Sequence, residues 1–301
     1  MEHEVSTFLS GCSSRAGFFY FSKESDQLVK EGEPNSTFFR FRDGDAAAQF
    51  RQFDESVGWP AISMAYVDLK QSPVIIAISP YGDYWELESV AADEKVGKIA
   101  RFTGNLRRLA AVDGKFYTCG MDRIALRRTS AGRWTSFGPG PLAGDPKVVG
   151  FEDIAGYSAT ELYAVGWGGE VWWYDGKKWR RADSPTSATL TSMTCASDGS
   201  VYVVGHDGVM LKGRHDQWEL VETKRRENLK DVAGLNGQIY VCTDFALFNL
   251  QKSGLVEQTD FAQVDDRPVT CLHLLETAGE LVSLGTKDVF VKRDAAWFRL
   301  V

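Results

Sequence analysis

The sequence has no long hydrophobic run and no excess of basic residues. No stretch approaches the roughly 18 apolar residues of a transmembrane helix, and residues 1–14 carry acidic side chains where a signal peptide needs positive charge. Lysine and arginine number 34 against 41 acidic residues, giving a net charge of −7. Binding to nucleic acid or to an anionic membrane needs a basic surface. We therefore expect a cytoplasmic, bacterial protein without a nucleic-acid or membrane partner.

Motifs for metals, nucleotides and catalytic nucleophiles are also missing. The five cysteines, an odd number, have no CxxC spacing, and the four histidines are not spaced as metal ligands. The chain contains no Walker loop, no Gly-rich dinucleotide motif and no G-x-S-x-G nucleophile motif. We expect reduced, buried thiols, no metal and no cofactor.

The chain has instead one pattern of short strands, repeated. Residues 151–182 combine an apolar strand, a second strand ending at Gly166, a third strand, an Asp-Gly turn and a fourth strand opening at Trp179. The pattern recurs, with two weaker copies, at residues 106–137, 190–222, 229–258, 269–301 and about 62–102. The second strands end at marker residues 38 to 46 positions apart, namely Ser79, Gly120, Gly166, Gly205, Thr243 and Gly285.

A period of about 40 residues with four strands per repeat is typical of a β-propeller. Residues 61–301 hold six legible repeats, and residues 1–60 read as one more, irregular blade. We predict an all-β chain forming a single β-propeller domain, 1–301, of seven four-stranded blades; the alternative is six blades plus an N-terminal extension. Because the last repeat has its own fourth strand, AWFRLV, the ring closes either by a packed seam or by a shared-strand clasp.

The marker residues have local explanations. Glycine at the end of a second strand permits a tight or positive-φ turn. Tryptophan at the start of a fourth strand can cover the unpaired edge of the blade. Trp172 and Trp173, on opposite faces of a third strand, should both pack against neighbouring blades.

The repeated V-G-x-x-G-x-V and D-G-x-x-W elements resemble those of bacterial propellers related to the photosystem II assembly factor Ycf48 and to the BNR (Asp-box) repeat proteins. The resemblance covers about residues 62–301, and YDGKKW (174–179) and TSAGRW (129–134) retain fragments of the Asp-box. It implies a propeller that binds a ligand or a protein. The arginine triad, paired acids and tyrosine nucleophile of the hydrolases in that group do not map onto this chain.

Turns between second and third strands converge on one face of a propeller, which usually carries the function. Aromatic and arginine side chains gathered there suit a protein interface. The predicted binding residues are Tyr81, Met121, Arg123, Trp167, His206, Asp207, Phe245 and Lys287. The alternative is a set of ordinary solvated turns. The basic segment 222–230 is interpreted as a solvated loop, and the neighbours His206 and Asp207 lack a nucleophile to complete a triad.

The third positions of the innermost strands form a second set: Ser63, Arg108, Asp153, Ser192, Asp231 and Cys271. Asp153 and Asp231 are interpreted as structural acids, with Arg108 as a partner from a neighbouring blade. The rival is a glycoside hydrolase or lyase using both acids and Arg108 as a substrate clamp. The leading prediction is a non-catalytic, monomeric propeller that binds another protein, in its sharpest form a bacterial immunity protein that neutralises a toxin.

Overall fold

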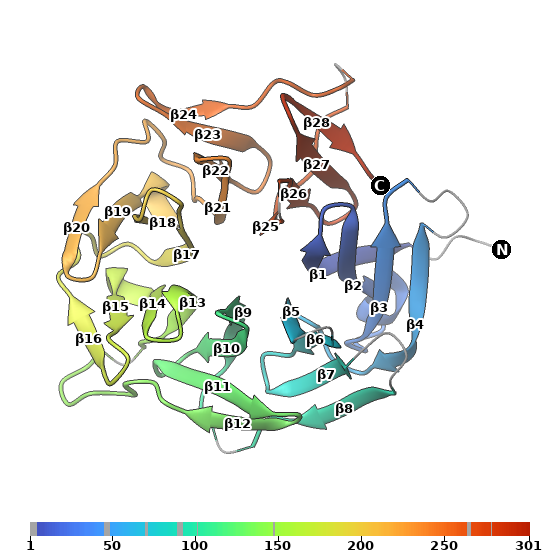
Figure 1. Cartoon of the computed structure of the whole chain (residues 1–301), viewed down its shortest axis with the longest axis horizontal. Helices are drawn as coiled ribbons and strands as arrows, with labels where there is room; N and C mark the ends of the chain where they lie inside the picture. Colours follow the sequence, from blue (N-terminus) through green and yellow to red (C-terminus); the bar gives the residue numbers. More distant parts are fainter. Residues whose placement is uncertain are drawn as a thin grey trace.

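The computed structural model describes residues 5–44, 49–69, 72–88, 93–100, 102–146, 148–263, 266–277 and 279–301. Within these ranges the chain forms seven antiparallel four-stranded sheets arranged in a ring (Figure 1). Each sheet contains four consecutive strands, paired in chain order. The prediction of a seven-bladed propeller is confirmed, and the six-blade alternative is wrong because residues 6–57 form a complete blade.

The first three blades use the N-terminal part of the chain. Blade 1 comprises β1 (Ser6–Arg15), β2 (Phe18–Ser25), β3 (Ser36–Arg42) and β4 (Phe50–Val57), with helix α1 (Asp26–Lys30) between β2 and β3. Blade 2 comprises β5 (Ser63–Leu69), β6 (Ser72–Ile78), β7 (Asp83–Glu88) and β8 (Glu94–Lys98). Blade 3 comprises β9 (Leu106–Val112), β10 (Lys115–Gly120), β11 (Ile124–Ser130) and β12 (Arg133–Ser136).

The remaining four blades follow the same plan. Blade 4 comprises β13 (Phe151–Ser158), β14 (Glu161–Gly166), β15 (Val171–Tyr174) and β16 (Trp179–Ala182). Blade 5 comprises β17 (Leu190–Cys195), β18 (Val201–Gly205), β19 (Met210–Arg214) and β20 (Gln217–Leu220). Blade 6 comprises β21 (Asp231–Leu235), β22 (Gln238–Cys242), β23 (Leu247–Gln251) and β24 (Gly254–Glu257). Blade 7 comprises β25 (His273–Glu276), β26 (Leu281–Leu284), β27 (Val289–Arg293) and β28 (Ala296–Arg299).

The propeller has two distinct faces. The first strand of each blade lines the central channel and the fourth lies at the rim (Figure 1). Because the strands alternate in direction, the turns between second and third strands share one face with the linkers between blades; we call this the loop face. The hairpins joining first to second and third to fourth strands lie on the opposite face, the hairpin face.

The ring closes through a packed seam between blades 1 and 7. No strand is exchanged, since β1 to β4 and β25 to β28 each form their own sheet. The apolar core of the seam comprises Phe8, Phe19, Phe21 and Phe41 from blade 1 with Val282, Leu284, Val289 and Val291 from blade 7. The Phe8 amide also donates to the Thr286 carbonyl at 2.9 Å. The seam alternative is confirmed over the shared-strand clasp.

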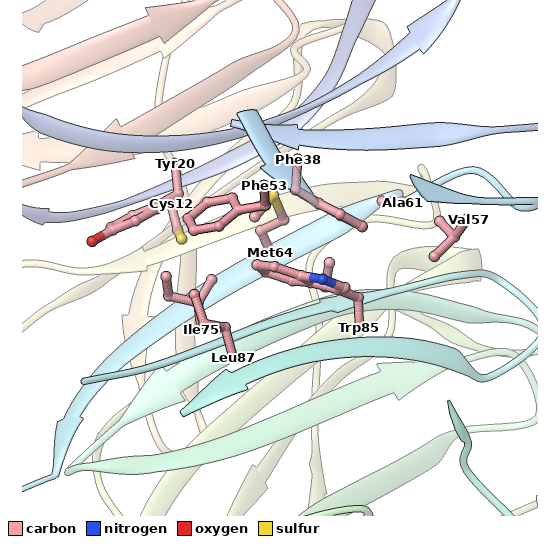
Figure 2. Packing of buried hydrophobic residues seen from close by; sticks show 11 residues of the cluster. Cys12, Tyr20, Phe38, Phe53, Val57, Ala61, Met64, Ile75, Trp85 and Leu87 are labelled. Atoms are coloured by element: carbon pink, nitrogen blue, oxygen red, sulfur yellow. The ribbon is translucent and has the colours of Figure 1, made fainter. Parts of the chain in front are cut away.

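Aromatic side chains fill the spaces between blades. Between blades 1 and 2, the ring of Phe38 stacks on that of Trp85 with centroids 4.2 Å apart, and Phe53, Met64 and Leu87 surround the pair (Figure 2). Trp85 is fully buried. Burying a side chain of about 200 Å² contributes on the order of 5 kcal/mol before entropy is counted, so such rings are major contributors to blade docking.

The marker glycines are required for a different reason from the one expected. Gly166 has φ 177° and Gly205 has φ −165°, both extended, so neither needs the left-handed region. A Cβ on Gly166 would lie 2.0 Å from the Gly150 carbonyl oxygen, and one on Gly120 would lie 2.1 Å from the Asn105 oxygen. The linker backbone entering the first strand passes against the end of the second strand, so a side chain is excluded there.

The marker tryptophans also pack differently from the prediction. Each joins the core between its own blade and the preceding one rather than covering the outer edge: Trp134, Trp179, Trp218 and Trp297. Trp172 packs toward blade 3 and Trp173 toward blade 5, which confirms the prediction that both contact neighbouring blades.

Candidate functional site: the loop face and the channel

All eight predicted binding residues lie in turns between second and third strands, hence on the loop face. Tyr81 is 61% exposed, Phe245 74% and Trp167 37%. His206 and Asp207 are also exposed. The residues are spread around the ring from blade 2 to blade 7. Three residues from two different blades, 3 and 4, lie close together: Met121, Arg123 and Trp167.

The Trp167 side chain is held in place although its ring is partly exposed. Its indole Nε1 donates to Glu152 Oε1 at 2.5 Å, and Glu152 lies 3.5 Å from Arg107 Nε. Its backbone amide donates to the Gly150 carbonyl at 3.0 Å. The 3-10 turn η1 (Trp167–Gly169) then reverses the chain, with Gly168 in the left-handed region at φ 65°. An ordered aromatic ring loses little side-chain entropy on binding, which suits a contact residue.

Arg123 is not available to a partner, contrary to the prediction that it is an interface residue. Its side chain is entirely buried and makes two paired contacts, with Glu170 (both 2.6 Å) and with Asp145 (2.5 and 2.8 Å). Hydrogen bonds from Arg123 and from the Leu142 amide lower the pKa of Asp145 to about 2. Burial alone would raise the pKa of Glu170, but its bonds to Arg123 and Trp172 lower it. The Arg123 guanidinium is therefore hydrogen-bonded to groups inside the protein.

Lys287 and Met121 have contacts of their own. Lys287 Nζ lies 2.6 Å from Asp26 Oδ2 and 2.7 Å from Thr7 Oγ1, so it spans the seam to blade 1 while remaining exposed. Met121 is half-buried and forms an isolated antiparallel bridge with Gly150. It therefore lies beside the linker that leads to Trp167.

Exposed apolar side chains are concentrated on the loop face. In the part of the chain that the structure describes, thirteen large apolar side chains are exposed, and eight of them lie in turns or linkers of this face. These eight are Val5, Val29, Tyr81, Leu142, Val148, Trp167, Phe245 and Val269. The sequence prediction missed five of them because it considered only the turns of blades 2 to 7 and left out the linkers and the N-terminal blade. Apolar residues inside otherwise polar linkers were the available signal.

The channel holds a ring of polar residues at one repeat position of the inner strands. Each member pairs with the residue just before the marker of its blade, as Asp153 pairs with Val165 and Asp231 with Cys242. In blade 7 this partner position is Leu284, which pairs with His273. The assignment of Cys271 to this set was therefore wrong by two residues; Cys271 is buried in the core between blades 6 and 7.

Four of these side chains converge in the channel with His273. Arg108 lies 3.4 Å from Asp153 and 3.3 Å from Asp231, and His273 lies 3.6 Å from Asp231. The Ser192 hydroxyl contacts both carboxylates. Backbone amides of the next blade complete the cluster, since Met193 donates to Asp153 at 2.8 Å and Leu274 to Asp231 at 3.0 Å.

The pKa values of the two carboxyl groups are shifted in opposite directions. Burial, together with repulsion by Asp231, raises the pKa of Asp153 to about 6. Burial acts on Asp231 as well, but attraction to Arg108 and His273 lowers its pKa. Asp231 is therefore the ionised partner of Arg108, and Asp153 carries the cost of a second buried negative charge.

The cluster is built as a link between blades. Asp153 and Asp231 are 2% and 1% exposed, and each joins its blade to the next one through a backbone amide. A cavity of about 360 Å³ runs along the inner strands and includes Arg108, Asp153 and Glu276 in its lining. Within the described ranges, no group of three or more His, Cys, Asp or Glu side chains is placed to hold a metal ion, and no helix has the length and hydropathy of a membrane span.

The fold and the site define a class. This is a seven-bladed propeller whose inner polar residues link neighbouring blades and whose exposed apolar side chains gather on one face. Such an arrangement is that of a binding protein.

Comparison with known proteins identifies the family. The chain is 40% identical over 222 residues to the immune protein Tsi7 of Pseudomonas aeruginosa (strain PAO1), a match covering 73% of this chain and 70% of that protein. The chain belongs to the family of this immune protein, and the prediction of an immunity protein built on a propeller is confirmed. No protein-family model matches the sequence.

Solved structures agree on the fold. The WD40 propeller domain of Doa1 superposes with a TM-score of 0.68 at 11% identity, covering 99% of this chain and 93% of that one. Ycf48 bound to a D1 peptide superposes with a TM-score of 0.69 at 15% identity, covering 96% and 93%. The likeness to Ycf48 supports that part of the expected resemblance at the level of the fold, whereas the Asp-box assignment gains no support from these comparisons.

Proposed function

We propose that this protein neutralises a cognate toxin by binding it through the loop face, without catalysis and as a monomer. The observation that carries the proposal is the concentration of exposed apolar side chains on that face, eight of thirteen in the described chain. Apolar side chains that are exposed together on one face of a protein commonly mark a site for another protein. Because the chain belongs to the family of the immune protein Tsi7, we propose that the partner is a toxin.

The chemistry of the turns supports a protein partner. Tryptophan and tyrosine dominate binding energy at interfaces, and Trp167 and Tyr81 are both exposed in turns of the loop face. All five cysteines are free, and four of them are buried. Free thiols fit a reducing compartment, which supports action in the cytoplasm.

A binding measurement with purified proteins tests the proposal. The probe is the purified product of the gene adjacent to this one, titrated by calorimetry into the wild-type protein and into Trp167→Ala. We expect tight binding by the wild type and a Kd about 10 to 100 times higher for the variant, because removing a central aromatic contact costs about 1.4 to 2.7 kcal/mol. Leu69→Ala, at an exposed apolar position where β5 ends on the hairpin face, is the matched control and should bind as the wild type does.

Two outcomes would contradict the proposal. One is binding of the wild type no tighter than micromolar, with no rescue of cells that express the probe. The other is neutralisation by Trp167→Ala and Phe245→Ala, singly and together, that equals neutralisation by the wild type.

A further inference from the structure

Three segments that are distant in sequence meet on the loop face above blades 3 and 4. They are the turn 121–123, the linker between β12 and β13, and the turn η1 with the following Glu170. Backbone contacts bring them together: the Asp122 amide donates to the Val149 carbonyl at 2.9 Å, and the Trp167 amide donates to the Gly150 carbonyl at 3.0 Å. The three segments therefore form one surface.

That surface carries four apolar side chains, one or two from each segment. They are Met121, Leu142, Val148 and Trp167, and we call them the Trp167 platform. Leu142 is 47% and Val148 48% exposed. A hollow of about 330 Å³ lies next to the platform, with Phe102, Ile124 and Pro141 in its lining. The lining also includes Thr103, Asp122, Arg123 and Ser136, so the hollow offers apolar contacts together with a few polar groups to a protruding side chain of a partner.

Arg123 lies beneath the platform and joins the three segments. It belongs to the first segment, it binds Asp145 of the linker with two hydrogen bonds, and it binds Glu170 of the third segment with two more. Its Nη1 also lies 3.4 Å from the Gly140 carbonyl of the linker. Asp145 in turn accepts a hydrogen bond from the Leu142 amide at 2.5 Å, so the exposed Leu142 is tied directly to the buried ion pair.

We propose that the Trp167 platform is the part of the loop face that the toxin contacts, and that Arg123 is a positioning residue that holds its three segments in register. The inference rests on the proposed function and names its surface. The occupant is a segment of the toxin that presents an apolar side chain to the platform and the adjoining hollow. A buried ion pair adds little net stability compared with apolar packing, whereas its fixed planar geometry sets the relative positions of the segments that carry it.

The first test separates positioning from folding. Asp145→Ala removes the tether to the linker while Arg123 keeps Glu170 as its partner. Asp175→Ala is the matched control, because Asp175 also accepts backbone amides and an arginine, has its pKa lowered to about 2 in the same way, and lies in a hairpin on the opposite face. Against the adjacent-gene protein we expect the Kd to rise at least tenfold for Asp145→Ala and to stay unchanged for Asp175→Ala. The Tm of the two variants should be similar.

The second test needs no toxin. The protein is labelled with 5-fluorotryptophan, and the Trp167 resonance is assigned with Trp167→Phe. In Arg123→Met we expect this resonance to shift or broaden together with that of Trp172, whose ring lies 5.3 Å from the Arg123 guanidinium. Arg123→Lys keeps the charge but cannot bind both carboxylates with two hydrogen bonds each. Compared with Arg123→Met, it should recover more of the wild-type Tm than of the wild-type Trp167 resonance and Kd.

The outcomes are distinguishable. If Asp145→Ala and Asp175→Ala bind the probe equally, the platform is not the contact surface and the inference fails, while the proposed function stands. If the Trp167 resonance is unchanged in a folded Arg123→Met, Arg123 is not a positioning residue. If the wild type does not bind the probe, the proposed function fails, and the fluorine spectra still decide the role of Arg123.

Discussion

At the scale of single residues, the channel shows that one repeat position can carry opposite electrostatic roles. Asp153 and Asp231 occupy equivalent places in blades 4 and 6, and both are almost fully buried. Both accept from Ser192 and from a backbone amide of the next blade. Asp231 also receives Arg108 and His273, whereas Asp153 shares Arg108 and faces the charge of Asp231. Ionised Asp231 therefore stabilises the ring, whereas ionisation of Asp153 destabilises it.

Substitution of the two acids by asparagine should separate these roles. The pKa of Asp153 is raised to about 6, so folding favours its protonated form, and its unfavourable contribution is relieved as the pH falls from about 6 toward 4. Asp153→Asn should flatten the dependence of the unfolding free energy on pH between about 4 and 6. The pKa of Asp231 is lowered, so its contribution is present above about pH 4. Asp231→Asn should lose about 3 to 5 kcal/mol at pH 8, because the half-buried Arg108 loses its ionised partner.

Urea unfolding at pH 5 and pH 8 measures both effects. Equal losses for the two variants at pH 8 would contradict the assigned roles. The same preparations serve to test the enzyme alternative, which predicts turnover of a glycoside by the wild type and its loss in Asp153→Asn.

At the scale of the element, blades 3, 4, 5 and 7 depend on a close approach between backbones. The end of the second strand and the linker entering the first strand come so near that a Cβ would overlap a carbonyl oxygen, as at Gly166 and Gly120. Blade 2 uses Ser79 at the same place, and its hydroxyl accepts from the amides of Tyr81 and Asp83. The marker position thus fixes both the turn and the linker.

Gly166→Ala should therefore destabilise more than a change at a neighbouring glycine with free space. We expect a loss of about 2 to 4 kcal/mol, because the new Cβ meets the Gly150 backbone rather than a side chain that can move. Gly168→Ala, at φ 65° with nothing within 4 Å of the added Cβ, should lose only about 1 kcal/mol. Thermal unfolding of the two variants compares them, and equal losses would show that the turn conformation, not the close approach, selects glycine.

At the scale of the whole molecule, the seam between blades 1 and 7 differs from the other six interfaces. Elsewhere a linker joins the two blades covalently, whereas here only side chains and a few polar contacts hold them. Arg293 reaches Asp43 across the seam while it also binds Glu280, and Glu280 accepts from the Gly17 amide. We therefore expect the ring to open at the seam more easily than at an interface between blades that a linker joins.

Phe8→Ala should weaken this interface specifically. Phe116→Ala is the control, since both rings are 2% exposed but Phe116 packs between blades 2 and 3. Both variants should lose about 3 to 5 kcal/mol. Only Phe8→Ala should accelerate hydrogen exchange in β1 and β26 ahead of the first and second strands of the other blades. Identical exchange patterns in the two variants would mean that the seam opens no more easily than an internal interface.

The fold could be predicted from the sequence because the repeat contains two positions that accept few residue types. Glycine at Gly166 and its equivalents and tryptophan at Trp179 and its equivalents recur every 40 residues or so. The register of the last blade was harder to predict. Cys271 and His273 are two positions apart and point the same way along an extended chain, and only the pairing of His273 with Leu284 decides between them.

The candidate site was less accessible to prediction. The sequence places Arg123 in a turn, where a charged residue is normally exposed. Its partners Asp145 and Glu170 lie 22 and 47 residues away, so the burial of the guanidinium depends on how the linker folds back over the blade. No local pattern encodes that path. The exposed linker residues Leu142 and Val148 were missed for the same reason.

The packed seam has a consequence for biosynthesis. Because blade 7 forms its own four-stranded sheet, β1 does not need a later strand of blade 7 as a pairing partner during synthesis. Each blade of about 40 residues is translated in roughly 2 to 8 seconds at typical rates, and each can dock on the previous one as it emerges. Only the contact between Phe8 and Val291 and their neighbours requires blade 7 to be present. The packed seam therefore allows the ring to form by successive addition of blades.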